Sequence, residues 1–206
     1  MSGPDTGTEL VDAIFERRTE PVRDLADQAE AVARTCHTMA RRFHQGGKLI
    51  VFGNGSSSTD AQHVAVEFVH PVIVGKRALP ALSLTSDVAT LTGVANRVGL
   101  AEVFAHQLRF VSDPADIALG ISLDGSCENV LRGLRCARER GLLTVALTGG
   151  DGGRIAREAS IDHVLVARAD DPRVVKEVHV TTYHILWELV HVFFEHPGAL
   201  GPEVVA

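Results

Sequence analysis

The chain has 206 residues, 45% of them hydrophobic, and a formal net charge of −6 with 20 basic residues scattered along the sequence. This length and composition suit one domain with a continuous apolar core. Because the basic residues form no cluster, we expect no direct binding to nucleic acid or to an anionic membrane. Small molecules and proteins are the expected partners.

The three cysteines, Cys36, Cys127 and Cys136, lack the spacing of a zinc knuckle, and their odd number argues against a disulfide framework. No stretch approaches the ~18 apolar residues that a membrane span needs, and residues 1–9 do not resemble a signal peptide. We therefore expect a cytoplasmic protein. Residues 1–8 and 198–206, which contain several Gly and Pro residues, are expected to be disordered.

Apolar residues recur every three or four positions over residues 9–45, the period of an amphipathic helix. The pattern predicts one or two long helices. A break is expected near Pro21, because proline lacks the amide donor and its ring clashes with the preceding turn.

From residue 48 onward, short apolar runs end in turns, most of them rich in Gly and Ser, that open into helical patterns. Strands that are apolar on both faces and alternate with helices indicate a parallel sheet covered on both sides. The sequence therefore predicts a doubly wound α/β domain, although it does not give the strand order. The five predicted strands span residues 48–52, 81–84, 117–121, 143–147 and 163–167, and the last leads into a long helix that ends near residue 195.

The turns after the first and third strands form a candidate anion-binding edge. In an open parallel sheet the carboxyl ends of the strands share one edge, and the helix N-termini there favour an oxyanion such as phosphate. One such turn alone is more simply interpreted as a tight strand-to-helix connection. Two in one sheet favour anion or sugar binding.

His63 and Glu67 are four residues apart on the helix after the first turn, so both can reach one metal ion or one reacting group. An ordinary surface pair is the alternative. On the last helix, His179 and His184 differ by about 140° in direction, so only one of them can face a small site. From its apolar neighbours alone, His184 is more simply a half-buried structural histidine.

The run GNGSS at residues 53–57, with DAQH at 60–63 and then Glu67, closely resembles the signature of phosphoheptose isomerases, which are sugar-isomerase (SIS) domain proteins. Residues 122–130, 147–153 and 176–184 continue the resemblance in order. It implies a single SIS domain over residues 1–206, with a flavodoxin-like, five-stranded parallel sheet flanked by helices and a long N-terminal helical segment over 9–45. It also implies a homotetramer whose sites are completed by neighbouring subunits.

The resemblance implies an aldose–ketose isomerase that converts sedoheptulose 7-phosphate, or a related heptose derivative, through an enediol. Glu67 and His184 occupy the positions of the acid/base pair. Several family members hold zinc at positions corresponding to His63, Glu67 and His184 plus a glutamine. The substrate-binding positions that it implies are Asn54, Gly55, Ser56, Ser57, Asn96, Arg97, Ser122, Asp124, Cys127 and Lys176.

The sequence departs from the family pattern at three places. Lys176 stands at the glutamine position, and because an ammonium cannot ligate a metal, this argues against zinc; pairing of Lys176 with Glu67 or with a phosphate is the expected alternative. The loop SLDGSC at 122–127 places Asp124 beside the expected phosphate, where Arg97 or Lys176 is a candidate to compensate its charge. Asn96-Arg97 replaces an Asn-Asp pair.

Three functions remain open. The first is an active isomerase on a seven-carbon sugar phosphate, favoured because the Glu67–His184 pair is intact. The second is a catalytically reduced SIS protein that binds a sugar derivative or a protein partner, as the DnaA initiator-associating protein does. The third is an isomerase for an unphosphorylated sugar, since Asp124 can accept hydrogen bonds from hydroxyl groups.

Overall fold

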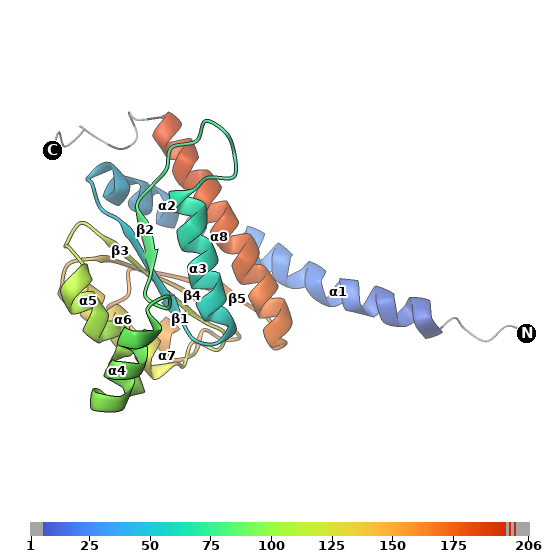
Figure 1. Ribbon diagram of the computed structural model, residues 1–206. Helices are drawn as coiled ribbons and strands as arrows, with labels where there is room; N and C mark the ends of the chain where they lie inside the picture. Colours follow the sequence, from blue (N-terminus) through green and yellow to red (C-terminus); the bar gives the residue numbers. More distant parts are fainter. Residues whose placement is uncertain (1–5, 197, 199, 201–206) are drawn as a thin grey trace, which may run out of the picture.

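Five apolar segments form one parallel sheet (Figure 1). They are β1 (Leu49–Gly53), β2 (Ala81–Ser83), β3 (Ile117–Ser122), β4 (Leu143–Gly149) and β5 (His163–Ala167), in the order β2-β1-β3-β4-β5. This is the order of flavodoxin-like sheets, and the predicted doubly wound α/β domain is confirmed. The structure is a computed structural model that describes residues 6–196, 198 and 200.

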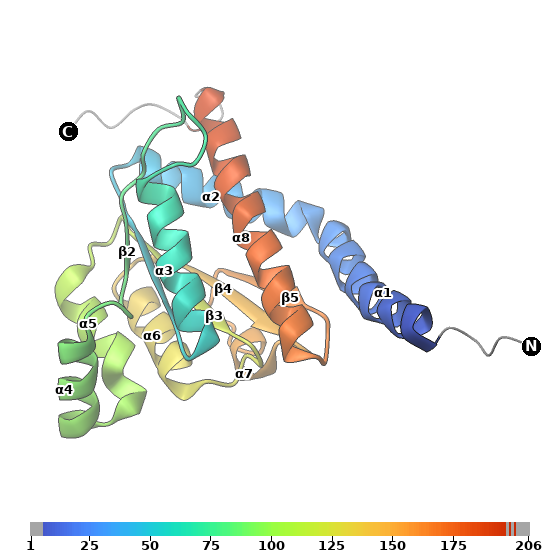
Figure 2. The ribbon, with the colours of Figure 1, turned by 45° about the vertical axis from the view of Figure 1, so that its right-hand side comes forward.

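Helices cover both faces of the sheet. The layer formed by α2, α3 and α8 lies on one face and the layer containing α5 and α6 lies on the other (Figures 1 and 2). Strand β1 shows why. Leu49 and Val51 pack in the core under α2, α3 and α8, whereas Ile50 and Phe52 pack in the core under α5 and α6, because successive side chains of a strand point to opposite faces. The helices are α1 (Thr6–Asp27), α2 (Ala29–His44), α3 (Ser56–Val69), α4 (Val88–Val98), α5 (Val103–Val111), α6 (Glu128–Glu139), α7 (Gly153–Ala156) and α8 (Pro172–Glu195), with a 3₁₀ turn, η1, at Leu100–Glu102.

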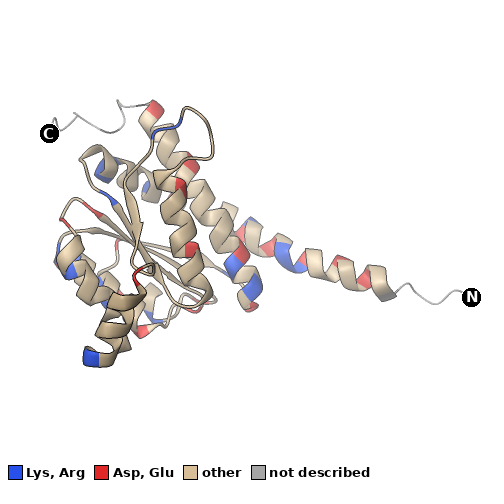
Figure 3. Cartoon of the chain, viewed as in Figure 1, with Lys and Arg blue, Asp and Glu red and all other residues tan. Residues whose placement is uncertain are grey.

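The five strands carry no charged residue, and the charged side chains lie mainly on the helices and connecting turns (Figure 3). This distribution is expected of a sheet whose two faces are both buried. Within residues 6–196, none of the helices combines the length and apolar character needed to cross a lipid bilayer.

The predicted break near Pro21 is wrong, because α1 continues through this residue to Asp27. Pro21 is buried, so its ring gains packing contacts that offset the missing backbone hydrogen bond. The break falls at Gln28 instead, where the side-chain amide donates to the carbonyl of Val166 in β5 (2.9 Å) and accepts from its N–H (3.2 Å). Helix α1 begins at Thr6, inside the segment expected to be disordered; residues 1–5, 197, 199 and 201–206 lie outside the described residues.

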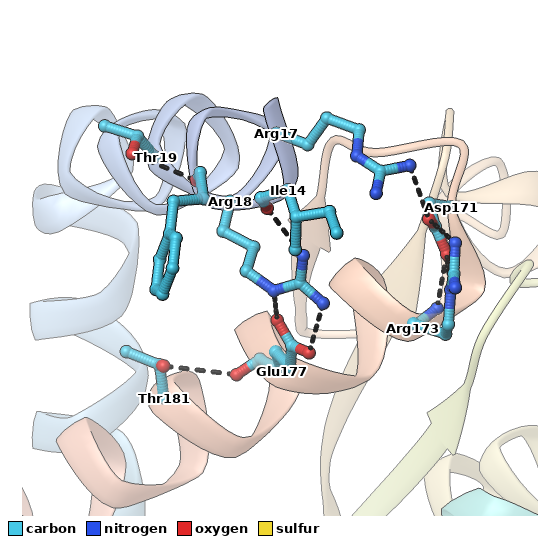
Figure 4. Close-up of polar contacts among 9 residues, drawn as sticks. Ile14, Arg17, Arg18, Thr19, Asp171, Arg173, Glu177 and Thr181 are labelled. Atoms are coloured by element: carbon cyan, nitrogen blue, oxygen red, sulfur yellow. Dashed lines mark hydrogen bonds and ion pairs between the residues drawn. The ribbon is translucent and has the colours of Figure 1, made fainter. Parts of the chain in front are cut away.

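The N-terminal part of α1 projects from the rest of the molecule (Figure 1). Figure 4 shows how α1 is fastened to α8: the guanidinium of Arg18 lies 2.7 Å from the carboxylate of Glu177, and Arg17 lies 3.8 Å from Asp171. Further toward the N-terminus, Leu10 and Phe15 are 64% and 67% exposed. The projecting helix therefore presents apolar side chains to its surroundings.

Candidate functional site

Two histidines and a carboxylate meet between α3 and α8. His63 Nε2 and His184 Nε2 each lie 3.1 Å from the same atom, Oε1 of Glu67. One ligand atom from each of the three side chains lies within 4.8 Å of the other two. Both imidazoles are nearly half exposed, whereas the Glu67 side chain is 13% exposed. We call these three residues the imidazole–carboxylate cluster.

The cluster forms because α3 and α8 pack side by side over the same face of the sheet (Figure 2). Trp187 fixes their alignment, since its indole N–H donates to the backbone carbonyl of Glu67 (3.1 Å). A pocket of about 490 Å³ opens beside the cluster, bordered by Glu67 and His184 and by Val72 and Ile73 of the segment after α3. The cluster is thus accessible to a small molecule.

Tyr183 also contacts this cluster, although no sequence motif predicted it. Its side chain is 1% exposed, and its hydroxyl lies 2.9 Å from Nδ1 of His63. Burial raises the pKa of the Tyr183 phenol, which therefore keeps its proton at neutral pH. A tyrosine in an apolar helical pattern is typical of a core residue, so the sequence offered no signal for this contact.

His179, by contrast, faces the sheet. It is 1% exposed and its Nε2 lies 3.0 Å from the backbone carbonyl of Thr148, to which it donates as a neutral imidazole. Burial lowers the pKa of His179. His179 and His184 therefore face in different directions, as their spacing predicts, and of the two only His184 borders the pocket.

The turns after β1 and β3 lie next to each other, because these strands are neighbours in the sheet. Asn54 links the first turn to the start of α6, which follows the second turn: its amide donates to Asn129 Oδ1 (2.7 Å), and the amide of Asn129 donates back to Asn54 Oδ1 (2.9 Å). Gly55 adopts a φ of 53°, which suits a glycine at the start of α3. We call residues 54–57 together with 122–127 the turn site. A pocket of about 270 Å³ adjoins it, lined in part by Asn54 and Gly55.

Asp124 occupies hydrogen-bond donors of the turn site with its own carboxylate. Oδ1 accepts from the backbone N–H of Ser126 (2.9 Å) and from the hydroxyl of Ser122 (3.1 Å), and Cys127 Sγ lies 3.9 Å away. The next residue, Gly125, has a φ of 64°, and a Cβ there would lie 1.9 Å from the carbonyl oxygen of Gly152. The loop is thus closed around an internal anion.

Lys176 pairs with Asp60 and not with Glu67. Its ammonium lies 2.5 Å from Oδ1 of Asp60, whose side chain is only 5% exposed, and donates to the carbonyl of Ser56 (3.1 Å). Lys176 therefore belongs to the turn site, where it adds a positive charge at the start of α3. Asn96 and Arg97 are exposed in the last turn of α4 and line neither of the two pockets.

One chain does not bring the turn site and the cluster into the same cleft. Ser56 and Glu67 stand near opposite ends of α3, and eleven residues of helix correspond to ~16 Å. The two pockets share no lining residue. Glu67 and His184 therefore share a pocket, but within a single subunit the turns at Asn54 and Ser122 do not line it.

The sequence profile of the SIS domain matches residues 15–149. The chain belongs to the SIS-domain family. This SIS-domain protein is 41% identical over 190 residues to the phosphoheptose isomerase of Solidesulfovibrio magneticus, covering 92% of each chain. It is 40% identical over 179 residues to that of Desulfovibrio desulfuricans, covering 86% of this chain and 84% of the relative.

Solved structures show the same similarity. The phosphoheptose isomerase GmhA of Neisseria gonorrhoeae superimposes with a TM-score of 0.82 at 29% identity, over 90% of this chain and 98% of that one. A phosphoheptose isomerase of Francisella tularensis gives a TM-score of 0.83 at 30% identity with the same coverage. The resemblance identified from the motifs of this SIS-domain protein is confirmed.

Proposed function

We propose that this SIS-domain protein is a sugar-phosphate aldose–ketose isomerase acting on sedoheptulose 7-phosphate or a related heptose derivative. The observation that carries the proposal is the contact between Glu67 Oε1 and Nε2 of His184. It places a carboxylate and an imidazole together at an open pocket. The relatives named phosphoheptose isomerase, which align over most of the chain, support the same substrate class.

In the proposed mechanism, Glu67 removes the proton from C1 of the ketose, the electron pair of the C–H bond forms the C1–C2 double bond, and the π pair of the C2 carbonyl moves onto its oxygen, which is protonated to give the enediol. The proton on Glu67 can exchange with solvent while the enediol is bound, and Glu67 then delivers a proton to C2, which gives the aldose. His184 carries the proton that must pass between the oxygens on C1 and C2. A carboxylate suits the carbon acid and an imidazole suits transfer between oxygens near neutral pH.

The cluster also fits a zinc ion. Two imidazoles and one carboxylate are a common donor set of catalytic zinc sites, which keep a further position open. Lys176 does not interfere, because it is bound to Asp60 and stands eight residues, ~12 Å, from His184 along α8. Zinc held by His63, Glu67 and His184 would polarise the sugar carbonyl and stabilise the enediolate.

We further propose that the complete site forms in a homotetramer, with the cluster of one subunit facing the turn site of another. Two observations support this arrangement. The cluster and the turn site lie at opposite ends of α3, and the projecting α1 exposes Leu10, Val11 and Phe15. Exposed apolar side chains grouped on one helix are typical of a surface that is covered in an assembly.

We infer a cytoplasmic location, supported by the cysteines. All three are free thiols, and burial raises the pKa of Cys36 to about 12. Free thiols, two of which are buried (Cys36 and Cys136), suit a reducing compartment.

Asp124 favours a second candidate, an isomerase or binding protein for an unphosphorylated sugar. Its carboxylate accepts hydrogen bonds from Ser122 and Ser126 that a phosphate would otherwise receive. A phosphate dianion at this loop must displace the carboxylate or tolerate its charge, whereas sugar hydroxyl groups can donate to it.

The deciding experiment compares turnover of phosphorylated and free seven-carbon ketoses by the purified protein, with and without added zinc. The first proposal predicts conversion of the phosphorylated ketose to the aldose. Conversion of the free sugar alone supports the second candidate as an isomerase. If the protein converts neither sugar, the isomerase proposal is wrong, and a rise in melting temperature with one of them would identify a binding protein.

A further inference from the structure

Tyr183 connects the buried core to the exposed cluster. It precedes His184 directly on α8, and its hydroxyl lies 2.9 Å from Nδ1 of His63 on α3. Its ring packs edge-on against both imidazoles, with centroid separations of 5.5 Å to His63 and 4.9 Å to His184. One buried side chain thus contacts both histidines that flank Glu67.

The positions of the protons follow from the neighbours of His63. Its Nε2 lies 3.1 Å from Glu67 Oε1, and a lone pair on Nε2 would repel an ionised carboxylate at this distance. The proton of a neutral His63 therefore lies on Nε2. Nδ1 is then an acceptor, and the hydroxyl of Tyr183 is the donor that it faces.

We propose that Tyr183 is a positioning residue of the isomerase site: its hydroxyl holds neutral His63 in the Nε2–H form and directs that nitrogen at Glu67. The proposal rests on the proposed function in that Glu67 is the group that removes the substrate proton. With both Nε2 atoms at Oε1, the carboxylate has a fixed orientation beside the pocket. A base held in one orientation needs less rearrangement to reach the reacting geometry.

The hydroxyl of Tyr183 can also orient His63 when a metal ion occupies the cluster. A metal bound at Nε2 requires the proton of His63 to move to Nδ1, and the oxygen of Tyr183 can then accept from it. Oxygen acceptors on the second nitrogen are the usual partners of metal-binding histidines. Phenylalanine at position 183 could neither donate a hydrogen bond to Nδ1 of His63 nor accept one from it.

The test uses Tyr183→Phe, which keeps the ring between the two imidazoles and removes only the oxygen. The matched control is Thr182→Val, which removes a buried hydroxyl from the neighbouring position. Thr182 donates to the carbonyl of Val178 within α8, and no contact of its hydroxyl with the cluster is found among the described residues. If both variants lose a similar amount of stability, that loss reflects only the removal of a buried hydroxyl group.

The primary measurement is ¹⁵N NMR of histidine-labelled, chelator-treated protein at about pH 8.5, where imidazoles are neutral. His63→Asn assigns the ring signals. In the wild type, His63 should carry its proton on Nε2 and show an Nδ1 signal shifted by hydrogen bonding. In Tyr183→Phe that shift should disappear and the other tautomer should gain population, while Thr182→Val should match the wild type.

The second measurement is kinetic. Loss of one orienting hydrogen bond should lower kcat by about three- to tenfold and change KM less than twofold, whereas Thr182→Val should change neither. A proton on Nδ1 of His63 in the metal-free wild type, or identical His63 signals in the wild type and Tyr183→Phe, would overturn the proposal. The wild-type spectrum decides the matter even when the variant fails to fold.

The spectrum does not depend on turnover, so the two proposals can fail separately. An inactive protein whose His63 carries the proton on Nε2 and bonds Tyr183 would contradict the proposed function and support the role of Tyr183 in orienting His63. An active isomerase with the proton on Nδ1 would contradict only the role of Tyr183.

Discussion

Glu67 Oε1 lies 3.1 Å from Nε2 of His184, although the two residues are 117 positions apart in the sequence. They meet because α3 and α8 pack side by side and the indole of Trp187 is bonded to the backbone carbonyl of Glu67. The catalytic proposal depends on this contact. The turn site can be tested independently of this contact.

The Lys176–Asp60 pair should stabilise the fold. Lys176→Gln leaves the carboxylate of Asp60, which is 5% exposed, without its countercharge. We expect the free energy of unfolding at pH 7 to fall by about 2 kcal/mol. Urea denaturation of Lys176→Gln, Asp60→Asn and the double variant measures the coupling. The double variant has no unpaired charge, so it should lose less free energy of unfolding than the two single variants lose together. If the two single losses simply add up in the double variant, Lys176 and Asp60 are not coupled.

Asp124→Ser should strengthen phosphate binding at the turn site. The substitution frees the N–H of Ser126 and the hydroxyl of Ser122 from the carboxylate and removes a negative charge. We expect affinity for inorganic phosphate to rise about tenfold, which corresponds to ~1.4 kcal/mol. Calorimetric titration measures it, with Asp151→Ser as a control for net charge. Equal affinity in wild type and Asp124→Ser would show that the carboxylate does not compete with phosphate.

Stability should decline in acid partly because of His179. Burial lowers the pKa of His179 in the folded protein, while the unfolded chain titrates near the ordinary value of about 6.5. The unfolded state therefore binds more protons below about pH 6.5, so stability is complete above that pH and is lost as the pH falls. Chemical denaturation at several pH values should give a shallower decline for His179→Gln than for wild type. An unchanged slope would mean that His179 does not contribute.

The doubly wound fold was predictable because each buried strand leaves a short apolar run between turns. The position of the α1–α2 break was not, because it depends on the contact of Gln28 with the backbone of Val166, which no local pattern records. The bond between Lys176 and Asp60 likewise joins residues 116 positions apart. The separation of the cluster from the turn site, however, follows from helix geometry. Ser56 and Glu67 are eleven residues apart on one helix, so they cannot line the same small cleft.

Mixed oligomers can show whether two subunits build one site. Glu67→Gln disables the cluster, and Asn54→Ala alters the turn site by removing the hydrogen bonds between Asn54 and Asn129 of α6. Each variant alone should be nearly inactive. Oligomers co-expressed from both should recover activity at about a quarter of their sites, because a quarter combine an intact cluster with an intact turn site. Sedimentation should show tetramers, and hybrids no more active than their parents would indicate that each site lies within one chain.

The most direct measurement of the central claim is hydrogen exchange with solvent during isomerisation. Wild type and Glu67→Gln are incubated in D₂O with sedoheptulose 7-phosphate, and the sugars are analysed by NMR. An enediol formed by Glu67 predicts deuterium at C2 of the aldose and, through the reverse reaction, at C1 of the ketose, with at least ~100-fold slower incorporation by Glu67→Gln. Isomerisation and deuterium incorporation by Glu67→Gln at the wild-type rates would contradict the assignment of Glu67 as the base.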